Sequence, residues 1–248
     1  MSSPYITQTE AVRRALEVAG GMATLGALYR IAPHIEGSIW SGTKTPFASI
    51  RRIVQTSDLF WKVQPGLWAL KTEEKRLTAE HKIPAKNTSS AAIEKFNHSY
   101  YQGLLVQWGS FEGHRTSVPA QDKNRLFLKD PLYKLATFTV PPSFTFDHLI
   151  NRAKTIDVGW YNQRNFPHAF FEVEHSTDIS NSLGKFVDFQ DFRTRFVIVA
   201  DELRRNEWNS KMSQAQFASI RGRVDFLSYE SLATSHANAA QKATLPSF

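Results

Sequence analysis

The stretch KTIDVGWYNQRNFPHAFFEVEHST, residues 154–177, decides the fold of this 248-residue chain. Residues 154–161 and 168–176 are rich in aromatic and β-branched side chains, which favour strands. The polar residues 162–165 between them are typical of a turn. The stretch therefore predicts two adjacent strands joined by a tight connection.

Three carboxylates lie in these strands. Side chains alternate between the faces of a strand, so Glu172 and Glu174 share one face and Val173 points to the other. Two acids on an otherwise apolar strand cost desolvation energy and repel each other unless a cation or donor compensates. Asp157 lies among apolar neighbours in the preceding strand, so pairing would bring three carboxylates to one edge. Hard oxygen ligands of this kind suit Mg²⁺, with Mn²⁺ expected to substitute.

The segments around this hairpin alternate between helical and strand patterns. Residues 91–111 carry apolar side chains at helical spacing on one face and Glu94, His98 and Gln102 on another. The following pattern predicts a helix near 180–192, a strand at 195–201, a helix near 202–219 and a strand at 224–229. This order predicts a mixed α/β (α+β) fold, with helices flanking a mixed sheet.

The N-terminal part follows a different pattern. Residues 7–20, 24–32 and 45–56 are expected to form three helices, with Thr7 or Thr9 as N-cap of the first. Two short aromatic-rich strands then flank Gln64-Pro65-Gly66, which is typical of a hairpin turn. We expect this part to form a domain of its own.

Three helices followed by a hairpin make a winged helix-turn-helix, and FWKVQPGLWAL (60–70) resembles the HARE-type winged helix often fused to restriction endonucleases. The resemblance covers about residues 5–71. It implies a third helix in the major groove and a wing on the DNA backbone. This would place five residues near DNA: Thr45, Ser49, Arg51, Arg52 and Lys62. The alternative is that the arginines only solvate an exposed face.

Domain boundaries follow from composition. Residues 72–90 mix both charge signs with almost no apolar periodicity, so we expect a linker between domains at 1–71 and 91–232. Residues 233–248 are small and polar and are expected to form a flexible tail.

Composition narrows the function classes. The formal net charge of +7 and pI near 9.6 favour a polyanionic partner such as double-stranded DNA. The absence of cysteine excludes disulfides and thiolate metal sites and fits a reducing cytoplasm. The sequence contains no uninterrupted apolar run of about 18 residues, so no membrane span is predicted. The sequence contains no Gly-rich phosphate loop that would predict a nucleotide cofactor. It also contains no ligand spacing that would predict a zinc site.

The spacing of the acids resembles the PD-(D/E)xK nuclease superfamily in its E-x-E variant. Thr155-Ile156-Asp157 is followed by fourteen residues and then Glu172-Val173-Glu174. The longer string FFEVEHST is more specific, and it resembles a group of restriction-like endonucleases over about residues 95–232. Three further strings match that group: HSYYQGLLVQWG (98–109), PAQDKNR (119–125) and VADELRRNEW (199–208).

The resemblance implies roles for individual residues. Asp157 and Glu172 would ligate the metal, and the carbonyl of Val173 would complete the shell. Glu174 stands where most of the superfamily has lysine, so it would serve as base or bind a second metal. Lys185, on the next helix, would supply a displaced positive charge, or it is an ordinary solvated lysine.

His98 and Gln102 match the first helix of that group and would reach the active site, or they are ordinary packed residues. The implied function is a Mg²⁺-dependent type II restriction endonuclease that cuts double-stranded DNA. A homodimer would match the two-fold symmetry of duplex DNA. Two alternatives remain open: a modification-dependent endonuclease that senses methylated DNA, and a non-catalytic DNA-binding regulator with a nuclease-like domain.

Overall fold

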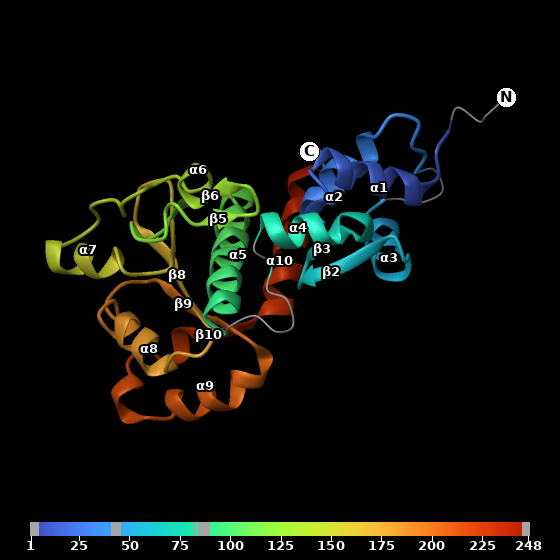
Figure 1. The fold of residues 1–248 in the computed structure, drawn as a ribbon. Helices are drawn as coiled ribbons and strands as arrows, with labels where there is room; N and C mark the ends of the chain where they lie inside the picture. Colours follow the sequence, from blue (N-terminus) through green and yellow to red (C-terminus); the bar gives the residue numbers. More distant parts are fainter. Residues whose placement is uncertain (1–4, 41–45, 82, 84–89, 245–248) are drawn as a thin grey trace. The chain divides into compact units, whose positions relative to one another are not determined.

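A computed structural model describes residues 5–40, 46–81, 83 and 90–244 (Figure 1). The chain divides into two compact units, Met1–Thr88 with Ala233–Phe248 and Ser89–Leu232. Both contain helices and sheets, which confirms the predicted mixed α/β class. Among the described residues, no helix combines the length and apolar character needed to cross a bilayer.

The first unit contains the three expected helices and the hairpin. The Thr7 side chain accepts a hydrogen bond from Glu10 N, and the Thr24 side chain caps the second helix through Ala27 N. Gly66 adopts φ +75° in the turn, a conformation that glycine tolerates best. A short strand that the sequence pattern did not predict joins the hairpin, giving the sheet order β1-β3-β2. The elements are α1 (Gln8–Val18), β1 (Met22–Thr24), α2 (Leu25–Ile31), a 3₁₀ turn η1 (Ala32–His34), α3 (Phe47–Thr56), β2 (Phe60–Gln64) and β3 (Leu67–Leu70).

Much of the predicted linker is folded. Residues after β3 form η2 (Lys71–Glu73) and α4 (Glu74–Glu80), and Leu77 is fully buried. Arg76 Nη2 donates to the carbonyl of Gly20 at 2.9 Å, which ties this helix to the first unit. Among the described residues of the predicted linker, the buried apolar side chains are Leu77 and Ile83, too few to produce a visible apolar period. Residues 84–89 of the predicted linker lie outside the described residues.

The predicted flexible tail is also wrong for residues 233–244. They continue helix α10 (Tyr229–Thr244), and from Ala233 onward they belong to the first unit. Ala237 packs in the apolar core of that unit with side chains of α1, α2 and α3. A Cβ at Gly26 would lie 2.8 Å from Ala240 Cβ, so the small residues that suggested a frayed end instead permit close helix packing. Residues 245–248 lie outside the described part.

The second unit is built on a five-stranded mixed sheet in the order β10-β9-β8-β7-β4. The strands β8, β9 and β10 are parallel, whereas β7 and β4 run antiparallel to their neighbours. β4 was not expected from the sequence pattern. The strands are β4 (Arg115–Ser117), β7 (Val158–Tyr161), β8 (Pro167–Glu174), β9 (Arg195–Ala200) and β10 (Val224–Ser228).

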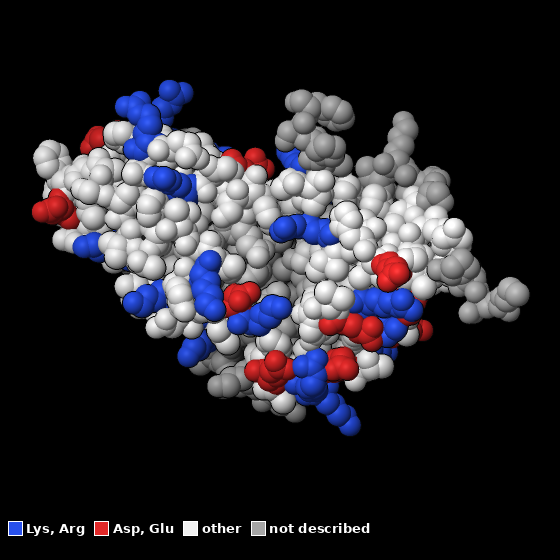
Figure 2. All heavy atoms as spheres, turned by 90° about the horizontal axis from the view of Figure 1, so that it is seen from above, with Lys and Arg blue, Asp and Glu red and all other residues white. Residues whose placement is uncertain are grey.

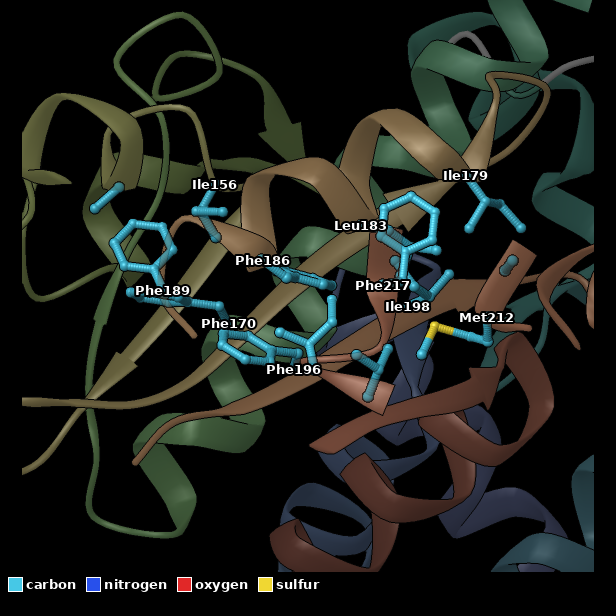
Figure 3. Close-up of a cluster of buried hydrophobic side chains, with 14 of the residues drawn as sticks. Ile156, Phe170, Ile179, Leu183, Phe186, Phe189, Phe196, Ile198, Met212 and Phe217 are labelled. Carbon is cyan, nitrogen blue, oxygen red and sulfur yellow. The ribbon is translucent and has the colours of Figure 1, made fainter. Parts of the chain in front are cut away.

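Helices cover both faces of this sheet. Trp160 of β7 donates from Nε1 to the carbonyl of Leu105 at 3.1 Å, which fixes α5 (Ser90–Phe111) on one face. α8 (Ile179–Val187), capped by Asp178, packs its Leu183 and Phe186 on the other face in the main apolar core (Figure 3). The remaining elements are β5 (Leu126–Phe127), β6 (Asp130–Pro131), α6 (Leu132–Leu135), α7 (Asp147–Ala153) and η5 (Arg221–Arg223).

The single helix expected near 202–219 is instead three short pieces, η3 (Glu202–Arg204), α9 (Arg205–Met212) and η4 (Ala215–Phe217). The Asp201 side chain accepts from Leu203 N and starts the first piece. Ser213 ends α9, and the chain then turns so that Phe217 reaches the core. Tertiary burial of one aromatic thus overrides a continuous helical pattern.

Candidate active site

The predicted carboxylates meet at one end of the sheet. Asp157 directly precedes β7, and in the β7–β8 register Val158 lies opposite Phe171, which places Asp157 beside Glu172. Asp157, Glu172 and Glu174 are 9%, 2% and 4% exposed. Ser182 Oγ of α8 contacts both glutamate carboxylates, so these two side chains share a face, as the strand alternation predicts.

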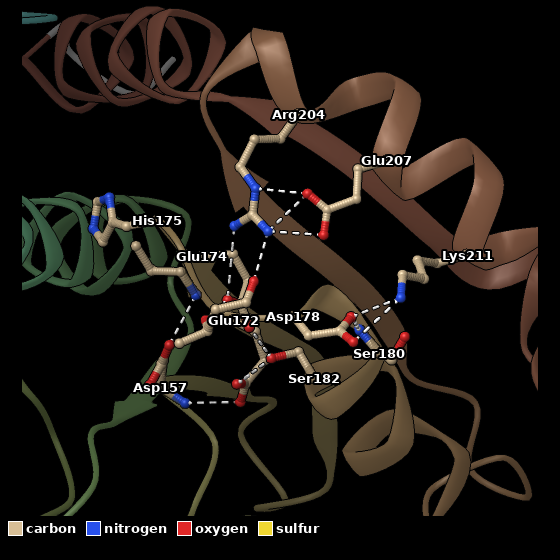
Figure 4. A network of polar contacts seen from close by, with 12 residues as sticks. Asp157, Glu172, Glu174, His175, Asp178, Ser180, Ser182, Arg204, Glu207 and Lys211 are labelled. Carbon is tan, nitrogen blue, oxygen red and sulfur yellow. Dashed lines mark hydrogen bonds and ion pairs between the residues drawn. The ribbon is translucent and has the colours of Figure 1, made fainter.

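Backbone groups hold Asp157 and Glu172 together. Asp157 N donates to Glu172 Oε1 at 3.2 Å, and Val173 N donates to Asp157 Oδ2 at 2.8 Å (Figure 4). Each carboxylate therefore accepts from the strand that carries the other. The pairing of β7 and β8 fixes the distance between the two acids.

Lys185 reaches the same place from α8. Its Nζ donates to Glu172 Oε2 at 2.7 Å and to the carbonyl of Thr155 at 2.9 Å. The ammonium therefore bridges the two segments that carry the carboxylates. This is the position in which a displaced lysine could act on the site.

The charge state of Glu172 bears on cation binding. Burial and the nearby Asp157 carboxylate raise the pKa of Glu172 to about 8, although Lys185 and Ser182 act in the opposite direction. Ser182 Oγ contacts both Glu172 and Glu174 but has one proton to donate. The second contact is a hydrogen bond only if one of the two carboxyl groups carries a proton. A divalent cation bound by Asp157 and Glu172 would offset the burial and the repulsion that disfavour the charged form of Glu172, and carboxylate oxygens are hard donors that suit such a cation.

Glu174 shares Ser182 with Glu172 and has further partners of its own. Its carboxylate accepts from Thr177 Oγ1 and Ser182 Oγ and lies 4.0 Å from Arg204 Nη1. Arg204 in turn pairs with Glu207 at 2.9 Å (Figure 4). Hydroxyl and guanidinium groups thus occupy the surroundings of Glu174.

His98 and Gln102 of α5 lie on the other side of Asp157. His98 Nε2 is 3.4 Å from Asp157 Oδ1 and 3.6 Å from Asp122 Oδ2. Burial lowers the pKa of His98, but the two carboxylates outweigh it and raise that pKa to about 9. Gln102 Nε2 donates to Asp122 Oδ2 at 2.9 Å and to the carbonyl of Asp157 at 3.2 Å. The structure therefore brings both helix residues to the carboxylates.

His175 is held by aromatic neighbours. Its Nδ1 lies 2.5 Å from Tyr229 Oη, and the Tyr229 ring stacks on Tyr101 at 3.9 Å. Burial, followed by the nearby His98, lowers the pKa of His175 to about 4. A neutral, hydrogen-bonded His175 fits a structural role beside the acids.

The acids open into a cavity of about 530 Å³. Basic side chains Lys95, Arg125 and Lys185 line it together with Asp157, Glu172 and Glu174. Positive and negative groups at one cavity suit a phosphodiester whose charge must be balanced.

A family model described as the type II restriction enzyme NmeDI C-terminal domain matches residues 80–247, more than half of the chain. The chain belongs to this family. No curated protein and no solved structure matches it. Membership of a restriction-enzyme family supports an endonuclease acting on DNA. The match also runs to residue 247, so this type II restriction-enzyme domain includes helix α10.

The candidate DNA-binding residues of this restriction-enzyme chain lie in the first unit, except that Thr45 is outside the described residues. Arg52 and Lys62 are exposed, whereas Ser49 and Arg51 are half-buried. A hollow of about 310 Å³ lies beside α3 and is lined by Tyr29, Phe47, Ala48, Arg51, Arg52, Gln55, Asn238 and Gln241. On the face drawn in Figure 2, basic and acidic side chains are intermixed.

Sequence reasoning missed part of the polar surroundings. Ser182 and Arg204 contact the predicted acids, and Asp122 contacts His98 and Gln102, but none of the three was assigned to the site. Asp122 and Arg204 lie in PAQDKNR and VADELRRNEW, two strings already noted for their resemblance to nucleases. That shared resemblance was the available signal, whereas Ser182 offered none.

Proposed function

We propose that this chain is a type II restriction endonuclease that uses Mg²⁺ to hydrolyse phosphodiester bonds in double-stranded DNA. One observation carries the proposal: buried Asp157 and Glu172 are locked together by the β7–β8 pairing, with Lys185 at 2.7 Å from Glu172, in a cavity with a basic lining. This arrangement supports the E-x-E variant of the PD-(D/E)xK superfamily, with the lysine moved to α8.

The residues would divide the work as follows. Asp157 and Glu172 would hold the cation, with the Val173 carbonyl as a third donor. When bound, Mg²⁺ supplies Lewis-acid stabilisation of the charge that develops on the phosphate. Lys185 would neutralise and orient Glu172 from a fixed position, because its ammonium also donates to the Thr155 carbonyl.

Glu174 would act from its hydrogen-bonded position as the group that accepts a proton from the attacking water. Thr177 and Ser182 fix its two oxygens. Lys95 and Arg125 line the cavity and would attract the DNA backbone. The first unit, as a winged helix, would add affinity through Arg51, Arg52 and Lys62. A homodimer would place one site on each strand of the duplex.

The test is digestion of plasmid DNA by purified wild-type protein with Mg²⁺ and with EDTA, compared with Asp157→Ala and with the exposed-acid control Asp191→Asn. We expect wild type and Asp191→Asn to cut DNA with Mg²⁺ but not with EDTA. Asp157→Ala should cut at least about a thousandfold more slowly while its DNA binding persists. Cutting by Asp157→Ala at the wild-type rate would overturn the assignment.

The same assay separates the alternatives. Cutting of methylated plasmid alone would identify a modification-dependent enzyme. DNA binding by wild type without any cation-dependent cutting on either substrate would identify a non-catalytic regulator. Sequenced ends of the products would give the position of the cut.

A further inference from the structure

A second group of potential metal ligands lies in the second unit. His98 comes from α5, Asp122 from the loop after β4, and Asp157 from the position directly before β7. One ligand atom from each lies within 4.8 Å of the other two. We propose that His98, Asp122 and Asp157 form a second divalent-cation site, one that takes Mn²⁺ or Zn²⁺ in preference to Mg²⁺.

The distances suit a small cation. His98 Nε2 lies 3.6 Å from Asp122 Oδ2 and 3.4 Å from Asp157 Oδ1. Ligand atoms about 2.0–2.2 Å from a cation lie roughly 3–3.5 Å from one another in octahedral or tetrahedral arrangements. The two distances from His98 therefore lie close to those of ligands on a common ion, and the ligand oxygens of Asp122 and Asp157 lie within 4.8 Å of each other.

The donor types set the preference for the cation. Mg²⁺ takes oxygen ligands and retains several waters, whereas imidazole nitrogen suits Zn²⁺ and other transition metals. Mn²⁺ accepts both carboxylates and imidazole. One imidazole with two carboxylates is thus chemically distinct from the all-oxygen set of Asp157, Glu172 and Val173.

Neighbouring groups orient the ligands. Gln102 Nε2 donates to Asp122 Oδ2, Arg125 Nε lies 3.0 Å from Asp122 Oδ1, and Val173 N donates to Asp157 Oδ2. Partners of this kind fix ligand geometry in protein metal sites. Gln102 also donates to the Asp157 carbonyl, so one amide links the segments that carry both aspartates.

Access comes from the cavity. His98 and Asp157 line it, while Asp122 is 2% exposed and lies beneath them. A cation entering from the cavity would keep an open side toward solvent, as catalytic sites do. Any role of this cation in cutting DNA rests on the proposed function, whereas its binding does not.

The competing explanation is a protonated His98 that bridges the two carboxylates without a metal. The experiment is a Mn²⁺ titration of the full chain, stripped with EDTA and free of DNA, followed by the electron paramagnetic resonance of free Mn²⁺. Co²⁺ added separately reports a histidine ligand through its visible absorption. The variants are Asp122→Asn and His98→Gln, with Glu172→Gln as the variant of the other cation set and Asp191→Asn as the exposed-acid control.

We expect wild type, Glu172→Gln and Asp191→Asn to bind Mn²⁺ at the His98 site. Asp122→Asn and His98→Gln should weaken this binding at least about tenfold and remove the Co²⁺ absorption. Absence of Mn²⁺ binding by wild type, or affinity unchanged in both variants, would overturn the proposal. If Asp122→Asn fails to fold by circular dichroism, His98→Gln decides alone, because His98 lies at the cavity wall. Mn²⁺ binding through His98 in a protein that does not cut DNA would retain the cation site and reject the proposed function.

Discussion

The two units of the chain differ in whether they bury charged side chains. Among the described residues, the buried polar side chains of the first unit are Thr24 and His236, whereas the second unit buries the carboxylates of Asp122, Asp157, Glu172 and Glu174. The charged groups of the first unit lie at its surface, where Arg13 pairs with Glu10 and Arg76 with Glu73. Burying a charge costs free energy that surface pairing does not. On the proposed function, the buried carboxylates would carry the chemistry in the second unit, and the arginines of the first unit would contribute to DNA binding.

The largest effect that would test this contrast concerns Lys185. Lys185→Met removes the ammonium that contacts Glu172 and Thr155, so we expect the cleavage rate in Mg²⁺ to fall by roughly 10²–10⁴-fold. DNA binding should be unchanged in a gel-shift assay. The matched control is Lys95→Met, another lysine of the same cavity, which should lose less than about tenfold. If the two variants lose cleavage rate equally, Lys185 contributes only its positive charge to the cavity and has no specific role at Glu172.

His236 tests the first unit. Burial lowers the pKa of His236 to about 4, from 6.5 in its ordinary state. The unfolded chain binds the proton more readily than the folded chain does. The stability contributed by neutral His236 is therefore fully present above pH 6.5 and is lost as the pH falls toward 4. The free energy of unfolding should fall over this range by on the order of 3 kcal/mol. Urea denaturation at several pH values should show His236→Gln gaining stability relative to wild type as the pH falls. His148→Gln, at an exposed histidine, is the control. A constant difference between wild type and His236→Gln would contradict the assignment.

Arg51 and Arg52 test the surface charges. We expect the double Arg51→Ala, Arg52→Ala variant to bind DNA about tenfold more weakly at moderate salt. The slope of log affinity against log salt should fall by roughly one for each phosphate that the variant no longer neutralises. Arg14→Ala is the control, because Arg14 is paired with Glu10 on α1. An unchanged slope would exclude α3 from the DNA interface.

The smallest effect concerns the stability of the metal-free second unit. Glu172→Gln retains an acceptor for Asp157 N but removes a buried charge that Asp157 repels, so thermal stability in EDTA should stay level or rise by a few degrees. Glu207→Gln, which breaks the pair with Arg204, should not raise it. A large loss of stability in Glu172→Gln would show that Glu172 is a structural acid.

Some of the site was predictable because it depends on local pattern. The period of two along β8 places Glu172 and Glu174 on one face, and Ser182 contacts both. The i, i+4 spacing of His98 and Gln102 on α5 likewise brings both toward Asp157. These are short-range regularities that the backbone geometry of a strand or helix guarantees.

The errors in the linker and in the tail share one cause. The expected linker was inferred from weak apolar periodicity and the expected tail from small, polar residues, yet Leu77 and Ala237 are fully buried. Single small or apolar residues can anchor a segment when a matching surface lies elsewhere in the chain. Such a surface forms only when the chain folds. Gly26 is an example, because its missing side chain leaves the space into which Ala240 packs.

The sequence by itself determined the mixed α/β class, the three N-terminal helices with their hairpin, and the strand that carries the paired glutamates, because each follows from residues within one element. Only the tertiary structure brought Asp122 beside His98 and Lys185 beside Glu172, and only it joined the C-terminal helix to the first unit. These contacts join residues from separate elements of the chain. The packing of whole helices on the sheet decides such contacts, and no local period encodes them.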